Sequence, residues 1–485
     1  MSGIRVRLVV AWCLLAACGE RAGGAASGVH DGGLSADALL SSAARSAPPP
    51  WLIGQNSFDR THPAFGVAQH HMANIFEAPR KDARVLGYLR RGARFRASEE
   101  VSREGCVKGW FEVLGGGFVC HGEGVSVDSK PPNYTDPPVL PALSDALPYR
   151  YMKTINKEVP QYMRLPTPDE ELAVNAAFLR LPAGGDAGVT SLAGLPPPLS
   201  LLVRARMQPG FYVSIDREVR DELNDRTFFR TVRGGYIRAE QLVDAKLPAG
   251  VGVPLGGRLQ LPLAFVYRNG APALRLDPVS AELVKAGPDL PNQSAHQLTG
   301  ASVVKNGRRY YVTADGLYLR DSAIRIVDRV PRPKHTGKNE RWIRVDLDRQ
   351  TLTAYDGEKP VFATLVSSGL NDHATPTGVY RLHAKHVATT MAEDLAGDGA
   401  YSIEDVPWTM YFLGGYALHA AFWHDKFGNQ RSHGCVNLAP RDARWLFFWG
   451  APDLPSGWHG AIAAVGKGAI VTLDSGSVYA IEQAN

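Results

Sequence analysis

The sequence predicts a mainly β protein. Short runs of β-branched and aromatic residues, separated by Gly, Asp and Pro, fill most of its 485 residues, and such runs are typical of strands joined by turns. Long helical patterns are hard to find. A strand–glycine turn–strand pattern with matching aromatic residues occurs three times, which indicates several small β modules.

The repeat is defined by pairs of aromatic residues eight positions apart. The pairs are Trp110 with Phe118, Phe228 with Tyr236, and Tyr310 with Tyr318. In each pair a turn containing Gly precedes the second residue, so each predicts a hairpin. The first copy, residues 66–127, resembles a bacterial SH3-like domain. That resemblance implies binding of wall peptides, and a plain spacer is the alternative. One or two further modules of this kind are expected within residues 140–330.

Residues 1–17 read as an export signal. Arg5 and Arg7 precede an apolar run from Leu8 to Ala17, which has the length of a signal core and is too short to span a bilayer as a helix. The run ends in LAACG, which resembles the lipobox of bacterial lipoprotein signals. The resemblance implies cleavage before Cys18 and lipid on that residue. A plain secretory signal is the alternative, and both take the protein out of the cytoplasm.

Residues 18–65 are expected to form a lipidated flexible tether, because the stretch up to Pro50 is rich in Ala, Gly, Ser and Pro. The expected location is the periplasmic side of a bacterial membrane. The outer membrane is favoured because Gly19, not Asp, follows Cys18. A net charge of +5 without a dense Lys/Arg run argues against nucleic acid as a partner.

The cysteines beyond the signal divide into a pair and a single residue. Cys106 and Cys120 flank the first predicted hairpin, where they form either a disulfide or two buried thiols. The sequence leaves both arrangements open. Cys435 remains as an unpaired thiol in an exported chain, which requires an explanation.

Residues 341–475 carry the residues suited to catalysis. An alternating hairpin opens the region, TPTG follows at residues 375–378, and SHGCVN follows at 432–437. A thiol of ordinary pKa is a poor nucleophile at neutral pH, and His419 or His433 could take the proton of Cys435. Gly434 would let a substrate approach the backbone amides closely, where an oxyanion is stabilised. The set suits covalent acyl transfer.

Two other interpretations compete with a nucleophilic Cys435. His419, His424, His433 and Cys435 are zinc-type ligands, but their spacing matches none of the usual paired-ligand patterns. We therefore expect no metal. A buried structural Cys435 is the second alternative, and the preceding Gly434 and the polar flanks Ser432 and Asn437 argue against it.

The string SHGCVN, with His419 upstream and TPTG before it, resembles the L,D-transpeptidase catalytic domain of the YkuD type. The resemblance spans nearly all of residues 341–475 and implies a β-sandwich-like fold without a cofactor. It assigns Cys435 as the nucleophile and His419 as its proton acceptor and donor. The residues that shape the site and its oxyanion contacts are then Ser432, His433, Gly434, Asn437 and Ala420.

Three further residues are predicted to contact substrate: Tyr411, Phe412 and His383. The acidic insertion from Met391 to Asp405 is interpreted as a lid over the site or as a solvated loop. Many relatives carry Arg at the position of Asn437. They often have Gly or Ser at the position of Ala420, whose backbone carbonyl is the part implied to orient the histidine.

The resemblance implies an L,D-transpeptidase that acts on peptidoglycan stem peptides through a Cys435 thioester and forms 3→3 crosslinks. It also implies acylation of the thiol by carbapenems. Three alternatives stay open at this point: an L,D-carboxypeptidase, an enzyme that anchors a protein to the wall, and a non-catalytic wall-binding lipoprotein. The expected partners are stem peptides, the membrane through Cys18 and, for the anchoring alternative, the anchored protein.

Overall fold

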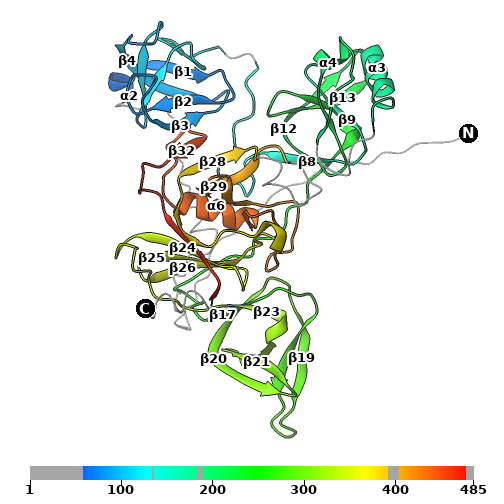
Figure 1. Ribbon diagram of the computed structural model, residues 1–485, viewed down its shortest axis with the longest axis vertical. Coiled ribbons are helices and arrows are strands. Elements are labelled where there is room, and N and C mark those ends of the chain that lie inside the picture. The colour runs from blue at the N-terminus through cyan, green and yellow to red at the C-terminus, as the bar shows by residue number, and fades with distance from the viewer. Residues whose placement is uncertain (1–57, 134–135, 183–188, 392–402, 477–485) are drawn as a thin grey trace, which may run out of the picture.

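The computed structural model describes residues 58–133, 136–182, 189–391 and 403–476, and it is mainly β, as the sequence predicts. A C-terminal domain (341–474) lies in the middle of three smaller parts (Figure 1). We call these the first module (64–128), the second module (150–244) and the third module (263–327). The predicted signal, Cys18 and the tether up to residue 57 lie outside the described residues. Within the described ranges, no helix is long and apolar enough to cross a membrane.

The C-terminal domain packs two sheets and one helix around a shared core. One sheet has six strands in the order β16-β26-β25-β24-β33-β27, and the other has β31-β30-β29-β28-β32 at one end of a twelve-stranded sheet. The bounds are β16 Val253–Pro254, β24 Arg341–Asp346, β25 Thr351–Asp356, β26 Lys359–Leu365, β27 Gly378–Arg381, β28 Ala384–Thr389, β29 Val406–Leu413, β30 Tyr416–Ala420, β31 Val436–Leu438, β32 Gly460–Ile462, β33 Ile470–Asp474 and helix α6 Pro440–Trp449.

Helix α6 begins directly after β31 and packs on β29 and β30. Pro440 occupies its first turn, where a missing N–H costs nothing. The buried Asp442 accepts hydrogen bonds from Gly252 N (2.9 Å) and Thr364 Oγ1 (2.6 Å). The start of α6 is therefore tied to β26 and to the segment that leads into β16.

The first module continues the second sheet of the C-terminal domain. Its strand β3 pairs with β32, with Tyr88 opposite Gly460, and Figure 1 shows the blue module seated on β32. The bounds are β1 Ala64–Ala68, β2 Ala73–Phe76, β3 Val85–Leu89, β4 Arg94–Ser102, β5 Trp110–Val113, β6 Phe118–Cys120, β7 Val125–Asp128 and, before them, α2 Phe58–Thr61.

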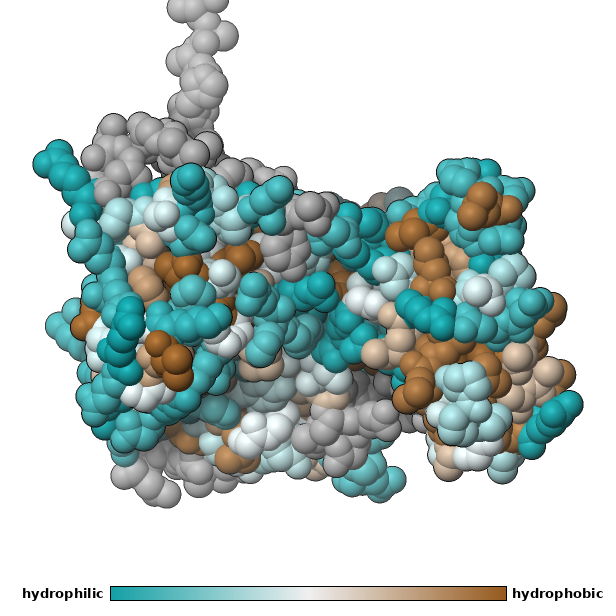
Figure 2. Space-filling view, turned by 90° about the horizontal axis from the view of Figure 1, so that it is seen from above, coloured by the Kyte–Doolittle hydropathy of each residue, from teal (hydrophilic) through white to brown (hydrophobic). Residues whose placement is uncertain are grey.

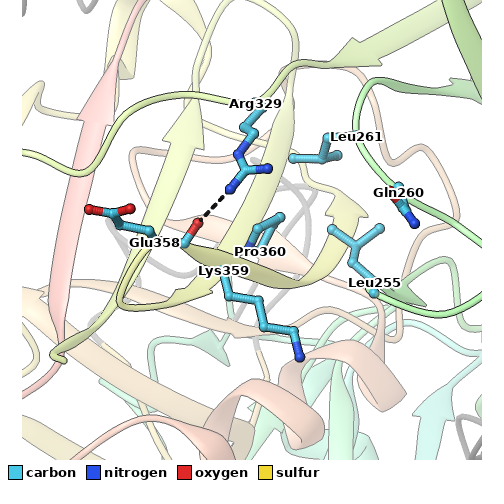
Figure 3. A pocket seen from close by; sticks show the side chains of 8 residues that line it. Leu255, Gln260, Leu261, Arg329, Glu358, Lys359 and Pro360 are labelled. Atoms are coloured by element: carbon cyan, nitrogen blue, oxygen red, sulfur yellow. Dashed lines mark hydrogen bonds between the residues drawn. The ribbon is translucent and has the colours of Figure 1, made fainter. Parts of the chain in front are cut away.

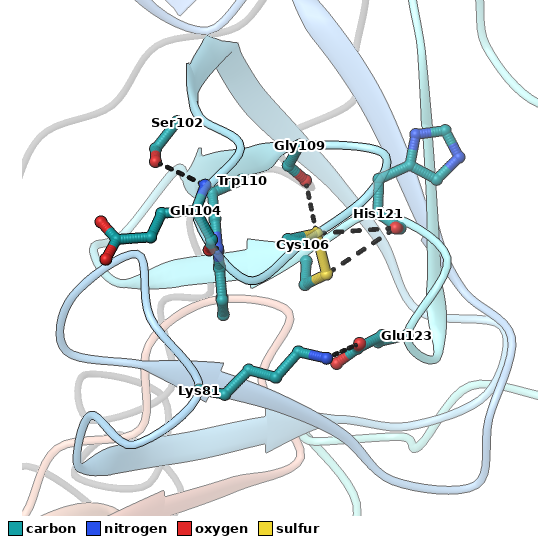
Figure 4. The surroundings of a disulfide bond; sticks show 9 residues. Lys81, Ser102, Glu104, Cys106, Gly109, Trp110, His121 and Glu123 are labelled. Carbon is teal, nitrogen blue, oxygen red and sulfur yellow. Dashed lines mark hydrogen bonds and ion pairs between the residues drawn. A yellow bond between two sulfur atoms is a disulfide. The ribbon is translucent and has the colours of Figure 1, made fainter.

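A disulfide joins Cys106 to Cys120 at the end of the β5–β6 hairpin (Figure 4). It lies against the buried Trp110, whose ring meets Phe76 edge-on at 5.6 Å between centroids. The indole N–H of Trp110 donates to Glu104 O at 2.7 Å. Of the two arrangements left open by the sequence, the structure has the bonded one.

The second module is an eight-stranded sheet with two helices. Thr167 caps α3 in a capping box with Glu170, and Pro168 occupies the first turn, so the sequence defines where this helix begins. The bounds are β8 Arg150–Thr154, β9 Val159–Tyr162, α3 Pro168–Phe178, β10 Val189–Thr190, α4 Leu199–Leu202, β11 Val203–Met207, β12 Tyr212–Asp221, β13 Arg226–Thr231, β14 Tyr236–Arg238, β15 Leu242–Asp244 and the 3₁₀ turn η1 Ala239–Gln241.

The third module projects from the other side of the C-terminal domain (Figure 1). Its seven strands form one sheet. The bounds are β17 Leu263–Val266, β18 Ala271–Leu276, β19 Leu283–Leu290, β20 Ala295–Lys305, β21 Arg308–Thr313, β22 Tyr318–Arg320 and β23 Ile324–Val327, with η2 Asp321–Ala323 in this module and η3 Asn371–His373 in the C-terminal domain.

The three predicted hairpins are confirmed, one in each module. They are β5–β6, β13–β14 and β21–β22, and all three have the same register. The first aromatic residue always pairs with the residue two places after the second aromatic: Trp110 with Cys120, Phe228 with Arg238, and Tyr310 with Arg320.

Seen from above, the first and second modules form two lobes with a furrow between them, and larger apolar patches lie on the right-hand lobe, the second module (Figure 2). Its exposed apolar side chains include Leu172, Leu179 and Leu201. Polar contacts join the two modules below: Arg90 of the first and Arg233 of the second both donate to Asp405 Oδ1, at 2.8 and 3.2 Å.

Candidate active site

Cys435 and His419 lie on neighbouring parallel segments of the C-terminal domain. His419 is on β30, and Cys435 immediately precedes β31, which pairs with β30 so that His419 is opposite Asn437. Side chains alternate along strands, and cross-strand partners share a face. His419, Asn437 and Cys435 therefore point to one face of the sheet, while Leu418 and Val436 point to the other and into the main core.

Cys435 is fully buried and is the free cysteine of the described residues. It belongs to an apolar cluster that also contains Tyr151 and Tyr212 of the second module and Phe422. Burial raises the pKa of the Cys435 thiol to about 12. The thiol is therefore neutral at physiological pH, and a reaction at its sulfur would require a base close by.

His419 is oriented by the backbone of its neighbour. Its Nδ1 lies 3.1 Å from the carbonyl oxygen of Ala420, and since a carbonyl only accepts, Nδ1 carries the proton. Nε2 is buried and has no hydrogen-bond partner among the described residues. Burial lowers the pKa of His419 to about 4. The imidazole is thus neutral with a free lone pair on Nε2, which is the form of a general base.

The turn before Cys435 is held by Ser432 and Gly434. The Ser432 hydroxyl donates to Cys435 O and accepts from Gly434 N at 3.2 Å. Gly434 has a φ of +113°, and a Cβ there would lie 2.4 Å from the ring of Tyr416. Only glycine fits this turn without displacing Tyr416.

His433 points to a second histidine that the sequence analysis did not include. Its ring lies 4.6 Å from that of His373, tilted by 46°, and His373 ends the 3₁₀ turn η3 just before the TPTG motif. Thr375 of that turn accepts from Gly369 N at 2.8 Å, and Gly369 pairs with Ser432. The two motifs cited for the resemblance therefore meet in space.

Asn437 supports the site from beside it. Its side chain forms a hydrogen bond with His424, 3.0 Å between Nδ2 and Nε2. Its backbone N–H and carbonyl pair with Ser367 at 2.9 and 3.0 Å. Asn437 thus fixes β31 to the strand end at Ser367 and to the segment after β30.

The three residues predicted to contact substrate do not lie together. Tyr411 is opposite Ala417 and shares the face of His419, and burial raises its pKa to about 12. His383 is exposed, with its ring 6.2 Å from that of Tyr411. Phe412, the next residue along β29, points the other way and is buried in the main core, where its ring lies 6.5 Å from that of Tyr416.

Two aromatic residues of the site were missed by the sequence analysis. Trp423 stacks on His419 at 5.8 Å with an angle of 25° between the rings, and Tyr416 lies against Gly434. The closeness of Trp423 to His419 in sequence was an available signal. Nothing in the sequence marks Tyr416, because its contact depends on the turn at Gly434.

The acidic insertion is only partly described, because residues 392–402 lie outside the described ranges. The interpretation of a solvated loop is wrong for its end. Asp405 is fully buried, and it accepts from Arg90, Arg233 and Ser214 Oγ, the last at 2.6 Å. The Tyr151 hydroxyl donates to its carbonyl. Asp405 therefore joins both upper modules to the strand that carries Tyr411.

A cavity of about 330 Å³ lies apart from these residues, where the segments that lead into and out of the third module meet the start of β26 (Figure 3). Leu255, Leu261 and Pro360 line it, and Arg329 donates to Glu358 O at 3.3 Å beside it. It contains neither Cys435 nor His419, so it does not belong to the site. Among the described residues, no three His, Cys, Asp or Glu side chains are arranged to hold a metal ion.

Comparison with known proteins bears on the same part of the chain. Residues 340–466 match the family model of the L,D-transpeptidase catalytic domain, YkuD, which confirms the resemblance over these residues. The Bacillus subtilis (strain 168) protein YciB is 24% identical to this chain over 119 residues. Its name describes it provisionally as an L,D-transpeptidase. That match covers 22% of this chain and 59% of YciB, so the chain spans less than two thirds of this relative.

Solved structures with matching regions include three L,D-transpeptidases. The one from Xylanimonas cellulosilytica is 24% identical, with 30% of this chain and 64% of that chain covered and a TM-score of 0.22. A mutant from Enterococcus faecium is 22% identical, with 31% and 55% covered and a TM-score of 0.23. The one from Mycobacterium smegmatis is 17% identical, with 48% and 95% covered and a TM-score of 0.23.

Proposed function

With an L,D-transpeptidase catalytic domain matched at residues 340–466, we propose that this protein is a cysteine L,D-transpeptidase that forms 3→3 crosslinks between peptidoglycan stem peptides. The observation that carries the proposal is the state of His419. Its Nδ1 is bound to Ala420 O, its Nε2 is free, and it faces the same side of the sheet as Cys435. This arrangement supports a base that takes the thiol proton.

In the first step the Cys435 thiol attacks the carbonyl that links the L-configured centre of the stem diamino acid to D-Ala. The thiol proton passes to His419 Nε2 as the S–C bond forms. Backbone N–H groups beside Cys435 hold the oxyanion. The tetrahedral intermediate then breaks its C–N bond, and the leaving D-Ala amine takes the proton from His419, which leaves a thioester.

In the second step an acceptor amine of another stem attacks the thioester carbonyl. His419 Nε2 takes a proton from this amine and returns it to the departing Cys435 sulfur, so the enzyme is regenerated without a cofactor. We assign Tyr411, which shares the sheet face of His419, and the exposed His383 to substrate contact. The turn at Ser432 and Gly434, with His433, shapes the base of the site.

The proposal extends to location. The export signal expected in residues 1–17 and the lipidation expected at Cys18 support a lipid-anchored protein on the periplasmic side of a bacterial membrane, with the outer membrane preferred. Both upper modules and the C-terminal domain would then lie within reach of the wall.

The test is mass spectrometry of products after the full chain is incubated with disaccharide-tetrapeptide, beside its Cys435→Ala variant. Crosslinked dimer with release of D-Ala, absent from the variant, is the expected result. Tripeptide without dimer would replace the proposal with an L,D-carboxypeptidase. Unchanged substrate, together with no labelling of Cys435 by a carbapenem, would remove the enzymatic function.

A further inference from the structure

The third module contacts the segment that connects the two catalytic strands. This segment, residues 421–431, leaves β30 after His419 and returns to the turn that precedes Cys435. Gln293 Nε2 of the third module donates to Asp425 O at 2.8 Å, and Arg325 Nε donates to Gly428 O at 2.9 Å. Two backbone carbonyls of the connecting segment are therefore held by side chains from outside the C-terminal domain.

Arg325 is itself held in place by an aromatic ring. Its guanidinium lies 4.0 Å from the centroid of the Tyr267 ring, close enough for a cation–π interaction. Tyr267 also lies against Gly428, where a Cβ would be 2.8 Å from Tyr267 Cβ and where φ is +94°. The close approach of the segment to Tyr267 requires glycine at this position.

Apolar packing reinforces the same contact. Phe427 of the connecting segment is fully buried in a cluster with Leu263, Phe265 and Val327 of the third module and Leu365 of the C-terminal domain. Phe427 thus anchors the connecting segment in a core that the third module completes.

From this segment the contacts continue to both catalytic positions. Trp423 stacks on His419. His424 packs on Phe427 at 4.9 Å between ring centroids and forms a hydrogen bond with Asn437, the partner of His419 across the strand pair. A displacement of the segment would therefore move the ring that lies on the general base and the residue that fixes β31.

We propose that the third module is a brace for the catalytic segment, and that Arg325 is a positioning residue for the reaction of Cys435. Arg325 touches neither catalytic side chain, and it acts through Gly428 and the contacts of residues 421–431. The expected effect of Arg325 on turnover rests on the proposed function. Its expected effect on the accessibility of Cys435 does not.

The experiment compares Arg325→Ala with Arg308→Ala, which removes an exposed arginine from strand β21 of the same module. Two readouts are taken on the full chain: kcat and KM with disaccharide-tetrapeptide, and the rate at which iodoacetamide alkylates Cys435, followed by peptide mapping. For Arg325→Ala we expect kcat to fall about tenfold with KM within about twofold, because the reacting groups are misplaced while substrate contacts remain. Alkylation should be faster, because Cys435 becomes less protected.

Arg325→Lys should recover most of both values, since its ammonium can lie on Tyr267 and donate to Gly428 O. Equal kcat and equal alkylation in Arg325→Ala and Arg308→Ala would overturn the proposal. If Arg325→Ala does not fold, Gln293→Asn replaces it, since Gln293 has a φ of +67° that Asn tolerates. In that variant unchanged kcat and alkylation would be the overturning result. If the wild type shows no turnover, the proposed function fails, and a difference in alkylation alone still supports the brace.

Discussion

The Nδ1 atom of His419 is bound to the carbonyl oxygen of Ala420, 3.1 Å away. This bond fixes the tautomer, and it uses a backbone atom that any residue at position 420 supplies. The variation expected at this position among relatives is therefore compatible with one function, since orientation of the histidine does not depend on the side chain that follows it.

We expect His419→Ala to lower kcat/KM by about 10²–10⁴-fold, the usual contribution of a general base. Ala420→Gly keeps the carbonyl and should leave kcat/KM within about threefold, although loss of a buried methyl and the added backbone freedom cost about 1 kcal/mol of stability. Product formation by mass spectrometry and thermal unfolding of both variants check this. A large loss of turnover in folded Ala420→Gly would mean that the side chain, not the carbonyl, orients His419.

Local patterns made the hairpins and the family match of the C-terminal domain predictable. The aromatic residue, the glycine turn and the returning strand lie within about a dozen residues, so the pairing of Phe228 with Arg238 follows from short-range sequence. Cys435 and His419 could be proposed as site residues because a thiol and an imidazole are identified by residue type alone. The mainly β class follows from the same local runs.

Contacts between distant segments were not predictable. The sequence predicts substrate contact for both Tyr411 and Phe412, and only the register of β29 against β30 shows that these two side chains lie on opposite faces of the sheet. In the same way Asp405 reads as one of several acids in a polar stretch. Its partners Arg90 and Ser214 lie 315 and 191 residues away in the sequence, and no periodicity connects them with Asp405.

Removal of the disulfide should weaken the first module without changing the chemistry. The bond closes a loop with a sequence separation of 14 residues, for which loop-closure entropy gives about 3 kcal/mol. We expect Cys106→Ser with Cys120→Ser to lower the free energy of unfolding of this module by about 2–4 kcal/mol. Amide hydrogen exchange within residues 64–128 at increasing urea concentration measures it, with turnover per folded molecule as the control. Unchanged stability would mean that the two thiols are not bonded in the native protein.

Buried histidines should make stability depend on acidity. Burial lowers the pKa of His386 and His419 to about 4 and that of His424 to about 3. Below pH 6.5 these histidines take up protons in the unfolded chain but stay neutral in the folded protein. Their contribution to the free energy of unfolding is therefore complete above pH 6.5 and is lost as the pH falls toward 4. Burial raises the pKa of Asp442 and Glu404, so these carboxyl groups stabilise the fold as the pH falls, opposite to the histidines. The effect of one histidine is therefore measured by comparing a variant with the wild type.

His386→Gln should reduce the slope of unfolding free energy against pH by about one proton between pH 6.5 and 4. Gln can still accept the hydrogen bond from the Tyr88 hydroxyl, which lies 2.9 Å from His386 Nδ1. Urea titrations of wild type and variant at four pH values give the two slopes. Parallel curves would show that His386 does not titrate differently in the folded and unfolded chains.

Asp405 is expected to be the most sensitive ion-pair position. Its partner Arg90 is 6% exposed, so Asp405→Asn would leave a buried guanidinium without its counter-charge. Removal of one member of a buried pair costs about 3–5 kcal/mol. The matched control is Asp244→Asn, which breaks the exposed pair with Arg150, where the side chains are 63% and 50% exposed, and should cost less than about 1 kcal/mol.

Arg90→Met combined with Asp405→Asn should recover part of the loss, because the uncompensated charge is then removed as well. Thermal unfolding of the wild type, the two single variants and the double variant measures these differences in stability. Because Asp405 also holds the second module through Ser214 and Arg233, the single variant should become more sensitive to proteolysis between the modules. Equal losses for Asp405→Asn and Asp244→Asn would mean that the modules are held together by apolar packing around Tyr151 and Phe422 and not by this carboxylate.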